Sequence, residues 1–542
     1  MPDRKPFLAP LSNKLFRDIW VANNISNLGG LIQAVGAAWM MTSISTSENM
    51  VALVQASTTL PIMLFSLFSG AIADSFDRRQ VVVIAQWFMF LVSTGLAVFA
   101  YLGWITPWWL LTFTFLIGVG TALNNPAWQA AVGDLVPRDN VAGAVSLNSM
   151  GFNIVRSVGP AIGGAIVAAG GAALAFAANA ISYLALIWAL RAWKSEKLQT
   201  ALPREQMGPA MQAGLRYVSM SPNLIKVFFR SCIFGLSSVA ILALMPIVAR
   251  DIIKGGPLTY GFMLGAFGVG AIAGAFSNAW LREKLTSENI VRLAFAGFAL
   301  SEALMGATSS GLIAGLAAIV GGACWVVALS LFNTIVQLST PRWVVGRALS
   351  FYQTASFGGM AAGSWLWGAV AENNNVSLAL SIAAIVTGGG VIIGFFLPMP
   401  VFEELDLDPL DRFREPPLHL EILPRSGPIA IHIDYDIRDE DLKEFLALMV
   451  ERRRIRIRDG AQAWALMRDL ENPHIWTETY HTPTWVDYVR HNQRRTKADA
   501  ENLDRLWALH QGEGPPRVHR MIERQVIPPV DDVFHKPHIE PH

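Results

Sequence analysis

Residues 137–164 read PRDNVAGAVSLNSMGFNIVRSVGPAIGG, and residues 341–368 read PRWVVGRALSFYQTASFGGMAAGSWLWG. Both stretches begin with Pro-Arg, and an ungapped alignment at an offset of 204 residues pairs Gly159 with Gly363. Each begins in a loop and continues into a long apolar run. The chain therefore carries a candidate internal repeat, and its period is long enough to cover several helices.

A second pair of segments keeps the same offset. The stretch GAIADSFDRRQ (70–80) aligns with GAFSNAWLREK (274–284), and each follows an apolar run. Two separated matches at one offset are hard to obtain by chance. Duplicated halves are a common design of membrane transporters, in which two helix bundles are related by an axis along the membrane normal.

Composition divides the chain into two parts. The 542 residues are 53% hydrophobic and 15% charged, which argues against an ordinary soluble enzyme. Residues 1–400 hold 36 charged side chains, whereas the 142 residues from 401 to 542 hold 47. The pattern predicts a membrane body followed by a soluble tail. The tail has a net charge of −7, which disfavours a nucleic-acid partner.

The membrane body contains twelve apolar runs near the roughly 20 residues that a helix needs to cross a bilayer. They lie at about 16–42, 50–73, 80–102, 107–131, 141–168, 172–192, 224–249, 258–281, 289–308, 311–338, 345–371 and 376–397.

The loops between these runs predict the orientation. Thirteen Lys and Arg residues lie in the termini and the even-numbered loops, against only Arg250 and Lys254 in the odd-numbered loops. Because basic loops stay in the cytoplasm, both termini are expected there. Within the basic connection between runs six and seven, residues 207–217 could form an interfacial helix or an ordinary linker.

Several motifs resemble the major facilitator superfamily. GAIADSFDRR is similar to that family's loop signature between spans two and three, with Asp77 where the family usually has Gly. GPAIGG, with Gly159, Pro160, Gly163 and Gly164, resembles the span-five motif of its antiporters. Residues 10–400 resemble the subfamily that includes the enterobactin exporter and transmembrane secretion effectors. The resemblance implies export of a small molecule from the cytoplasm, driven by the proton gradient. No cofactor is expected.

The loop signature suggests a cytoplasmic gate. The expected gating residues are Gly70, Asp74, Arg78, Arg79 and Asp134. An acidic side chain at Asp74 can face the positive N-terminus of a neighbouring helix, and the two arginines can reach Asp134. The alternative is that the arginines only anchor the topology. For GPAIGG, a kink that seals one face against leakage competes with plain helix packing.

Polar side chains within the spans are candidates for the substrate cavity. Amides beside aromatic rings suit a mainly apolar substrate, although hydrogen bonds between helices would use the same residues. The expected wall comprises Asn23, Asn24, Gln33, Asn124, Asn125, Trp128, Gln129, Asn148, Asn153, Arg156, Asn333, Gln337, Tyr352 and Gln353.

Ionisable residues inside spans are functional candidates by default. Arg156 is the deepest cation, and it either attracts an anionic substrate or bonds to helix carbonyls. Asp18 and Glu302 are the candidates for proton coupling. Arg17 and Arg230 also lie within spans.

The tail predicts a small α+β domain. Strand and helix patterns alternate as β-α-β-β-α-β, which is typical of a ferredoxin-like fold. WALMRDL and WTETYHTPTW resemble the antibiotic-biosynthesis monooxygenases, a resemblance that makes homodimerisation a candidate. His432, Trp464, Trp476, His481 and His491 could line a pocket. The run Glu451–Arg456 is interpreted as a solvated helix face, or one facing anionic lipid.

The expected fold class is an all-α polytopic membrane protein of two six-helix bundles plus an α+β domain. The leading hypothesis is an exporter that alternates access to a small-molecule substrate within the lipid bilayer, without a metal site. The alternative is a membrane-anchored enzyme or sensor acting through the tail. The expected domains are the bundles at 1–193 and 223–400, a central loop at 194–222, a linker at 401–427, the soluble domain at 428–525 and a disordered end at 526–542.

Overall fold

The computed structural model describes residues 9–137, 140–193, 207–400 and 406–523. Within these, the side chains of 71, 73–75, 142 and 207 are outside the description. The predictions for Arg138, for the side chain of Asp74 and for the end at 526–542 therefore lie outside the described residues.

The chain forms two compact units. The first contains the described residues of 9–193, 223–336 and 349–400. The second combines residues 207–222 and 337–348 with the tail, 406–523. Each unit is described by itself below.

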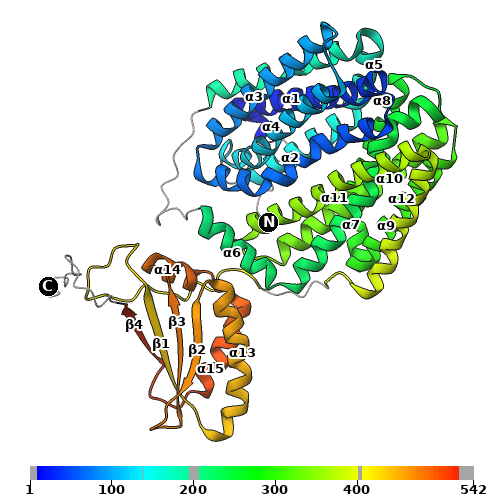
Figure 1. Ribbon diagram of the computed structural model, residues 1–542. Helices are drawn as coiled ribbons and strands as arrows, with labels where there is room; N and C mark the ends of the chain where they lie inside the picture. Colours follow the sequence, from blue (N-terminus) through cyan, green and yellow to red (C-terminus); the bar gives the residue numbers. More distant parts are fainter. Residues whose placement is uncertain (1–8, 138–139, 194–206, 401–405, 524–542) are drawn as a thin grey trace. The chain divides into compact units, whose positions relative to one another are not determined.

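The first unit consists of long helices (Figure 1). They begin where a side chain caps the free backbone N–H groups: Ser47, Asp77 and Thr106 each accept a hydrogen bond from the N–H three residues on. The helices are α1 Lys14–Ile44, α2 Glu48–Ser75, α3 Arg78–Tyr101, α4 Pro107–Asp134, α5 Val141–Ala189, α7 Pro222–Ile247, α8 Pro257–Lys284, α9 Ser287–Ala307, α10 Gly311–Leu338, α11 Val345–Asn373 and α12 Val376–Phe396.

Nine helices in the described part of the chain are long and apolar enough to cross a membrane. The predicted runs at 141–168 and 172–192 fall together in α5, which is 49 residues long. Gly171 interrupts it with φ +75° and ψ 177°, so helical backbone stops between the two predicted runs. The predicted runs 16–42 and 345–371 are helical as α1 and α11.

Helix bounds follow the repeat seen in the sequence. Both bounds of α10 lie 204 residues after those of α4, and α11 begins 204 residues after α5. The glycine positions agree as well. A methyl group at Gly159 would press on Leu31 of α1, and one at Gly363 would meet the carbonyl of Leu236 in α7. Aligned glycines thus bring the corresponding helix pairs of each half together.

The two halves contact each other along α5 and α8, which lie side by side (Figure 1). A second contact joins α2 to α11, where the hydroxyl oxygens of Ser66 and Thr354 are 2.9 Å apart. In a third, a guanidinium N–H of Arg250 donates to the carbonyl of Thr42 at 2.6 Å.

The tail contains a four-stranded antiparallel sheet in the order β2-β3-β1-β4. Helices α13 and α15 cover one of its faces (Figure 1), and Phe445, Met449 and Leu506 pack there against Ile431. The strands and helices follow the predicted β-α-β-β-α-β order, with two helices between the third and fourth strands: β1 Ile429–Asp436, α13 Leu442–Asp459, β2 Gln462–Arg468, β3 Ile475–Thr482, α14 Trp485–Gln493, α15 Ala500–Leu509 and β4 Arg517–Ile522.

Two segments expected as connections belong to this second unit. Residues 406–422, expected as part of a linker, pack on the domain: the N–H of Leu410 bonds to the carbonyl of Arg495 at 2.9 Å, and Phe413 and Leu418 join the core. Residues Met207–Ser219 form the helix α6, so the helical alternative holds for this stretch, and α6 contacts α13.

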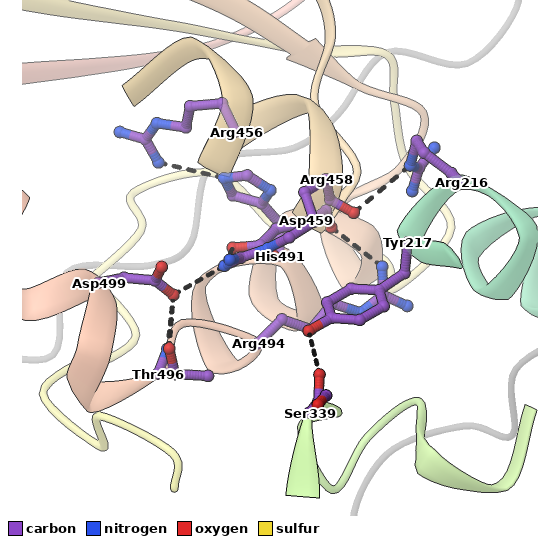
Figure 2. Close-up of polar contacts among 10 residues, drawn as sticks. All are labelled: Arg216, Tyr217, Ser339, Arg456, Arg458, Asp459, His491, Arg494, Thr496 and Asp499. Carbon is purple, nitrogen blue, oxygen red and sulfur yellow. Dashed lines mark hydrogen bonds and ion pairs between the residues drawn. The ribbon is translucent and has the colours of Figure 1, made fainter. Parts of the chain in front are cut away.

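Residues 337–348 also join the tail through α6. Figure 2 shows Tyr217 of α6 donating to the carbonyl of Ser339 at 3.3 Å, while Arg216 donates to the carbonyl of Arg458 at the end of α13. Burial raises the pKa of Tyr217 to about 12, so its phenol keeps the proton that it donates. Its ring also meets Trp343 edge-on. Three distant chain segments therefore build the second unit.

Candidate functional site

A cavity of about 420 Å³ lies within the first unit, with walls from both halves. The first half contributes residues of α1 to α5, and the second half contributes residues of α7, α8 and α11 such as Tyr260, Phe267 and Phe357. Its volume falls within the ~300–1,000 Å³ that small-molecule sites usually occupy. Apolar and aromatic side chains dominate, with amides and hydroxyls among them.

The first-half wall is organised by buried amides. Gln86 donates to Asn124 at 3.1 Å and accepts from Ser26 at 3.3 Å. Gln33 accepts from Ser93 and from Asn179, each at 2.6 Å. These bonds fix the amides in place, so the wall presents oriented donors and acceptors rather than free side chains.

Sequence reasoning missed part of this network. Gln86 and Ser93 lie seven residues apart in α3, and Asn179 lies in the second segment of α5. Spacing of seven places two residues on one helix face. Single polar residues on one face of otherwise apolar spans were the signal that could have identified them.

Arg156 of α5 lines the cavity and is the cation among its described lining residues. The described part of the cavity wall includes no Asp or Glu. Within the described chain, no hydrogen bond or ion pair is found for Arg156, which does not support the alternative that it is bonded to helix carbonyls. A guanidinium exposed to such a cavity favours a ligand that carries negative charge.

Asn124, Asn125, Arg156 and Gln33 are the predicted wall residues that line the cavity. For several others, the alternative of hydrogen bonding elsewhere holds. Trp128 donates to Asn148 at 3.0 Å, joining α4 to α5 within the first half. The residues absent from the described lining of this cavity are Asn23, Asn24, Trp128, Gln129, Asn148, Asn153, Asn333, Gln337, Tyr352 and Gln353.

Several of these residues bond to nearby groups in the helices. Asn153 bonds to the carbonyl of Ser149 in its own helix, and Tyr352 donates to the carbonyl of Leu329 at 3.2 Å. In an apolar surrounding a polar side chain takes whichever backbone or side-chain partner is nearest. Polarity within a span therefore does not by itself identify a cavity wall.

The two candidates for proton coupling differ in position. Asp18 is exposed and lies 3.4 Å from the guanidinium of Arg17, so it is not part of the cavity. Glu302 of α9 has no exposed surface and accepts a hydrogen bond from Thr387 of α12 at 2.6 Å. Its second carboxylate oxygen has no partner in the described chain. Glu302 is also outside the described cavity lining.

The GPAIGG glycines hold α5 against two helices. A methyl group at Gly163 would lie 3.0 Å from the Cα of Ile32 in α1. One at Gly164 would lie 2.8 Å from the carbonyl oxygen of Pro257 and 3.0 Å from the Cα of Gly261, both in α8. Since α8 belongs to the other half, Gly164 and Gly261 form part of the seam between the halves. Pro160 lines the cavity beside this seam.

Part of the expected gate contact is present. Arg78 at the start of α3 donates to Asp134 at the end of α4 at 2.8 Å. Arg79 instead donates to the carbonyl of Leu190 at 2.9 Å, which corrects its expected contact with Asp134. All these groups belong to the first half. A rigid rotation of one half against the other would leave the Arg78–Asp134 pair intact, so it positions the loop after Gly70; its gating role remains a prediction.

Arg230, an in-span cation without a predicted partner, is paired in the second half. It lies 2.7 Å from Glu288 of α9, and Glu288 also accepts from Arg292 at 2.9 Å. Arg230 reaches the carbonyl of Leu397 as well. The network joins α7, α9 and the end of α12, and a buried cation with a carboxylate partner is best explained as structural.

Comparisons with known proteins agree with this arrangement. A family model described as "Transmembrane secretion effector" matches residues 6–526. The enterobactin exporter EntS of Escherichia coli O1:K1 is 27% identical over 414 residues, which is 74% of this chain and 94% of that protein. The staphyloferrin A transporter of Staphylococcus aureus is 27% identical over 248 residues, 45% of this chain and 62% of that relative, so this second match spans less than two thirds of the relative.

Solved structures show the fold. The nucleoside transporter NupG superposes with a TM-score of 0.59 at 12% identity, over 71% of this chain and all of that chain. A bacterial homologue of the human lysosomal transporter Spinster gives 0.57 at 14% identity, over 72% and 96%. The first unit thus has the fold of major facilitator transporters, its relatives are transporters rather than enzymes, and this chain belongs to the transmembrane secretion effector family.

Proposed function

We propose that this protein is a secondary transporter that exports a small amphipathic anion from the cytoplasm. The observation that carries the proposal is the cavity walled by both halves, in which Arg156 faces a described lining without carboxylates. The relatives extend the argument, since one is an enterobactin exporter and another a staphyloferrin A transporter. A siderophore-like or drug-like substrate combines the apolar surface and the negative charge that such walls accommodate.

The proposed topology has twelve spans with both termini in the cytoplasm. It counts α5 as two spans, because helical backbone stops at Gly171, and it includes α1 and α11. The excess of Lys and Arg in the even-numbered loops supports the orientation. In this topology the protein is a multi-pass protein of the bacterial inner membrane, and a reporter fused after His542 is expected in the cytoplasm.

The proposed mechanism is alternating access by rotation of the halves. The seam at Gly164 and Gly261 allows close approach of α5 and α8. Helix α2 meets α11 through a few hydrogen bonds, among them the hydroxyl pair of Ser66 and Thr354 and the bonds from Ser47 and Asn49 to Glu372. Contacts of this kind separate with a modest loss of free energy, because a neutral hydrogen bond contributes only about 1 kcal/mol and one to a charged group about 1.5–3 kcal/mol. They suit surfaces that must part and rejoin in each cycle.

Proton coupling is proposed at Glu302. It is a fully buried carboxyl group in a span, and one of its oxygens has no hydrogen-bond partner in the described chain. Because it contacts Thr387 rather than the cavity, protonation would act by changing how α9 packs on α12. Glu302→Gln should remove the dependence of export on a pH gradient, measured in proteoliposomes, whereas Asp18→Asn should not. Unchanged gradient dependence in Glu302→Gln would exclude this residue.

The export function is tested in cells. Metabolites should accumulate in the cytoplasm of a strain lacking the gene and return to normal when the gene is restored. Arg156→Ala should fail to restore export, whereas Arg17→Ala should restore it, because Arg17 is an exposed cation in the first turn of α1. An unchanged metabolite profile in the deletion strain would contradict the proposal.

Truncation of the tail distinguishes the proposed export function from its alternative, in which the tail carries the main activity. If the tail carries the main activity, removing residues 406–542 should abolish that activity while the membrane unit remains intact. If the tail only regulates or assembles the transporter, the truncated chain should still export. Coverage of the open sheet face by a second copy remains a prediction, which light scattering of the purified full-length protein would test.

A further inference from the structure

The tail contains a second cavity, of about 360 Å³, between the helix-covered face of the sheet and the segment 410–414. No Asp or Glu is found among its described lining residues. Six arginines line it, and they come from four separate parts of the tail: Arg412, Arg414, Arg452, Arg456, Arg495 and Arg520.

The deepest of these arginines share one carboxylate. Arg452 and Arg456 of α13 are 2% and 1% exposed, and Glu478 of β3 has no exposed surface. They lie on the core face of the sheet, where Glu478 pairs with Ile433 of β1. The expectation of a solvated or lipid-facing helix side is therefore wrong for these two arginines, although it fits Arg453 and Arg454, which are exposed.

Both carboxylate oxygens of Glu478 accept hydrogen bonds from donors other than Arg452. One of its oxygens accepts from Arg456 Nε at 2.9 Å and from Trp464 at 3.0 Å. The other accepts from the phenol of Tyr435 at 3.1 Å and from a second N–H of Arg456 at 3.4 Å. Four donors use the acceptor capacity of a carboxylate. Burial alone would raise the pKa of Glu478, but Arg456 and Arg452 hold it at about 2, so it is ionised at neutral pH.

Arg452 is left without a hydrogen-bonded acceptor for its Nε. That atom lies 3.6 Å from Glu478, beyond hydrogen-bond range, and is buried without a partner in the described chain. Arg495 donates to the amide oxygen of Asn492, a neutral group. Burial, together with Arg456 and Arg452, lowers the pKa of Arg495 to about 10. Positive charge in this cavity therefore exceeds the negative charge that the protein supplies.

Neighbouring carboxylates are paired with other arginines. Asp459, which also interacts with Arg495, pairs with Arg458 at 2.9 Å. Asp504 pairs with Arg412 at 2.7 Å, and both are exposed at the rim. His491 contacts Arg456 at 3.1 Å, and burial together with Arg456 and Arg495 puts its pKa well below the usual value, so it is uncharged. A buried charge without a partner is unstable, and a bound anion would relieve that instability.

We propose that this cavity binds a small organic carboxylate with an aromatic or apolar body. Arginine recognises carboxylates through paired N–H groups, and Arg452 and Arg495 supply donors that the protein leaves uncompensated. The remaining wall is apolar and aromatic, from Ile433, Tyr488 and Trp507 among others, which fits a ring rather than an inorganic ion. Exposed Arg414 and Arg520 lie at the cavity rim, where a ligand enters.

The test uses the full-length protein in detergent and two probes that have the same shape but differ in charge. Titration calorimetry with 1-naphthoate should show saturable binding, and 1-naphthamide should bind at least about tenfold more weakly, as expected when a charge-assisted hydrogen bond is lost. Equal affinities for the acid and the amide, or no saturable binding of naphthoate, would overturn the proposal. Binding of inorganic phosphate without binding of naphthoate would contradict the carboxylate class.

Variants locate the site. Arg452→Gln and Arg495→Gln should each weaken naphthoate binding by about tenfold or more. Arg414→Gln should also weaken naphthoate binding. Because Arg414 is exposed, that loss cannot be ascribed to misfolding. Arg438→Gln, a surface cation of the same domain paired with Glu440, is the matched control and should bind normally.

One further variant separates this cavity from the transport cavity. Naphthoate is itself an amphipathic anion, so the transport cavity can bind it as well. Arg156→Gln should leave unchanged that part of naphthoate binding which Arg452→Gln and Arg495→Gln weaken. Loss of binding in Arg156→Gln but not in Arg452→Gln or Arg495→Gln would assign the probe to the membrane unit and refute the tail site. Export itself can fail or succeed independently of this measurement, so the two proposals are tested apart.

Discussion

Single side chains in the tail show how strongly context decides the role of a charge. Arg452 and Arg453 are neighbours in α13, yet the first is buried and the second is exposed. Arg452 and Arg456 continue the helical stripe of Phe445 and Met449, so they occupy positions where apolar side chains normally face the sheet. A buried arginine destabilises the fold unless it is paired with a carboxylate. Replacing Arg452 and replacing Arg456 by the same apolar residue should therefore have opposite effects on stability.

Arg452→Met should stabilise the tail of the ligand-free protein. Replacing an incompletely paired buried ion by an apolar side chain of similar volume often stabilises a protein, by about 1–4 kcal/mol. Arg456→Met should destabilise it by about 3–5 kcal/mol, because Glu478 then keeps only distant Arg452 as its cation. Thermal unfolding of the tail in the full-length protein measures both. A lower unfolding temperature for Arg452→Met would contradict the assignment of uncompensated charge.

His491 should make the tail less stable in mild acid. Its folded-state pKa is lowered by burial and by Arg456, so the unfolded chain binds more protons below a pH of about 6.5. Stability is then complete above that pH and falls as the pH drops, by at most about 1.4 kcal/mol per unit for this group. Glu478, with a pKa of about 2, adds its own loss only below about pH 4.5.

The measurement is the unfolding temperature of the tail between about pH 7.5 and pH 5. His491→Gln keeps an acceptor for Arg456 and should flatten the dependence, although His510, whose pKa burial also lowers, will leave part of it. Exposed His474 is the control, and His474→Gln should preserve the slope. A slope that survives unchanged in His491→Gln would refute the assignment.

At the level of elements, the seam between α5 and α8 depends on glycine. The nearest atoms to an added methyl group at Gly164 are the backbone atoms of Pro257 and Gly261, which cannot move aside as a flexible side chain would. The same motif packs α5 on α1 through Gly163. The packing alternative for GPAIGG therefore has direct structural support, and it places the motif where the halves must meet.

Gly164→Ala should impair export while the protein still inserts into the membrane. Overpacking a close contact typically introduces about 1–3 kcal/mol of strain, enough to shift the balance between conformations by tenfold or more. Gly388→Ala in α12 is the matched control, since a methyl group there meets no atom within 4 Å. Initial export rates at equal membrane abundance compare the two, and equal rates would remove Gly164 from the mechanism.

The positions of the helices could be predicted from the sequence better than the hydrogen-bond partners of their polar side chains. Apolar length predicted helix positions that the structure reproduces, as for the run 107–131 within α4, because it is a local property of the chain. The partner of a polar side chain depends on which helices become neighbours, which no local pattern contains. Trp128 and Asn148 were expected in the cavity; they bond to each other outside its described lining, whereas Gln86 was missed although it bonds to Asn124 in the wall.

At the scale of the whole molecule, the second unit draws on three parts of the chain. The helix α6, between the halves, bonds to the tail domain through Arg216, and the segment 337–348, between α10 and α11, bonds to α6 through Ser339 and to the tail through the pair of Arg342 and Asp408 at 3.3 Å. Tyr217 contributes a buried ring against Trp343 and a hydrogen bond to Ser339. The tail is therefore joined to the two connections that a rotation of the halves would move.

Tyr217→Ala should loosen α6 and residues 339–348 without unfolding the sheet. Amide hydrogen exchange of the full-length protein should rise in those two segments, since the mutation removes an aromatic contact worth about 0.5–1.5 kcal/mol beyond its burial. Exchange in β1 should stay slow. Unchanged exchange in α6 would contradict the packing described for this unit.

The central claim is that export requires the two halves to separate along α2 and α11. Ser66→Cys and Thr354→Cys, in a chain with Cys232 and Cys324 replaced by Ser, place two thiols where the native hydroxyl oxygens are 2.9 Å apart. The decisive measurement is the export rate, before and after oxidation, of the compound that metabolite profiling identifies. The account predicts that a disulfide between these positions stops export and that reduction restores it; full export by the oxidised, crosslinked protein would contradict it.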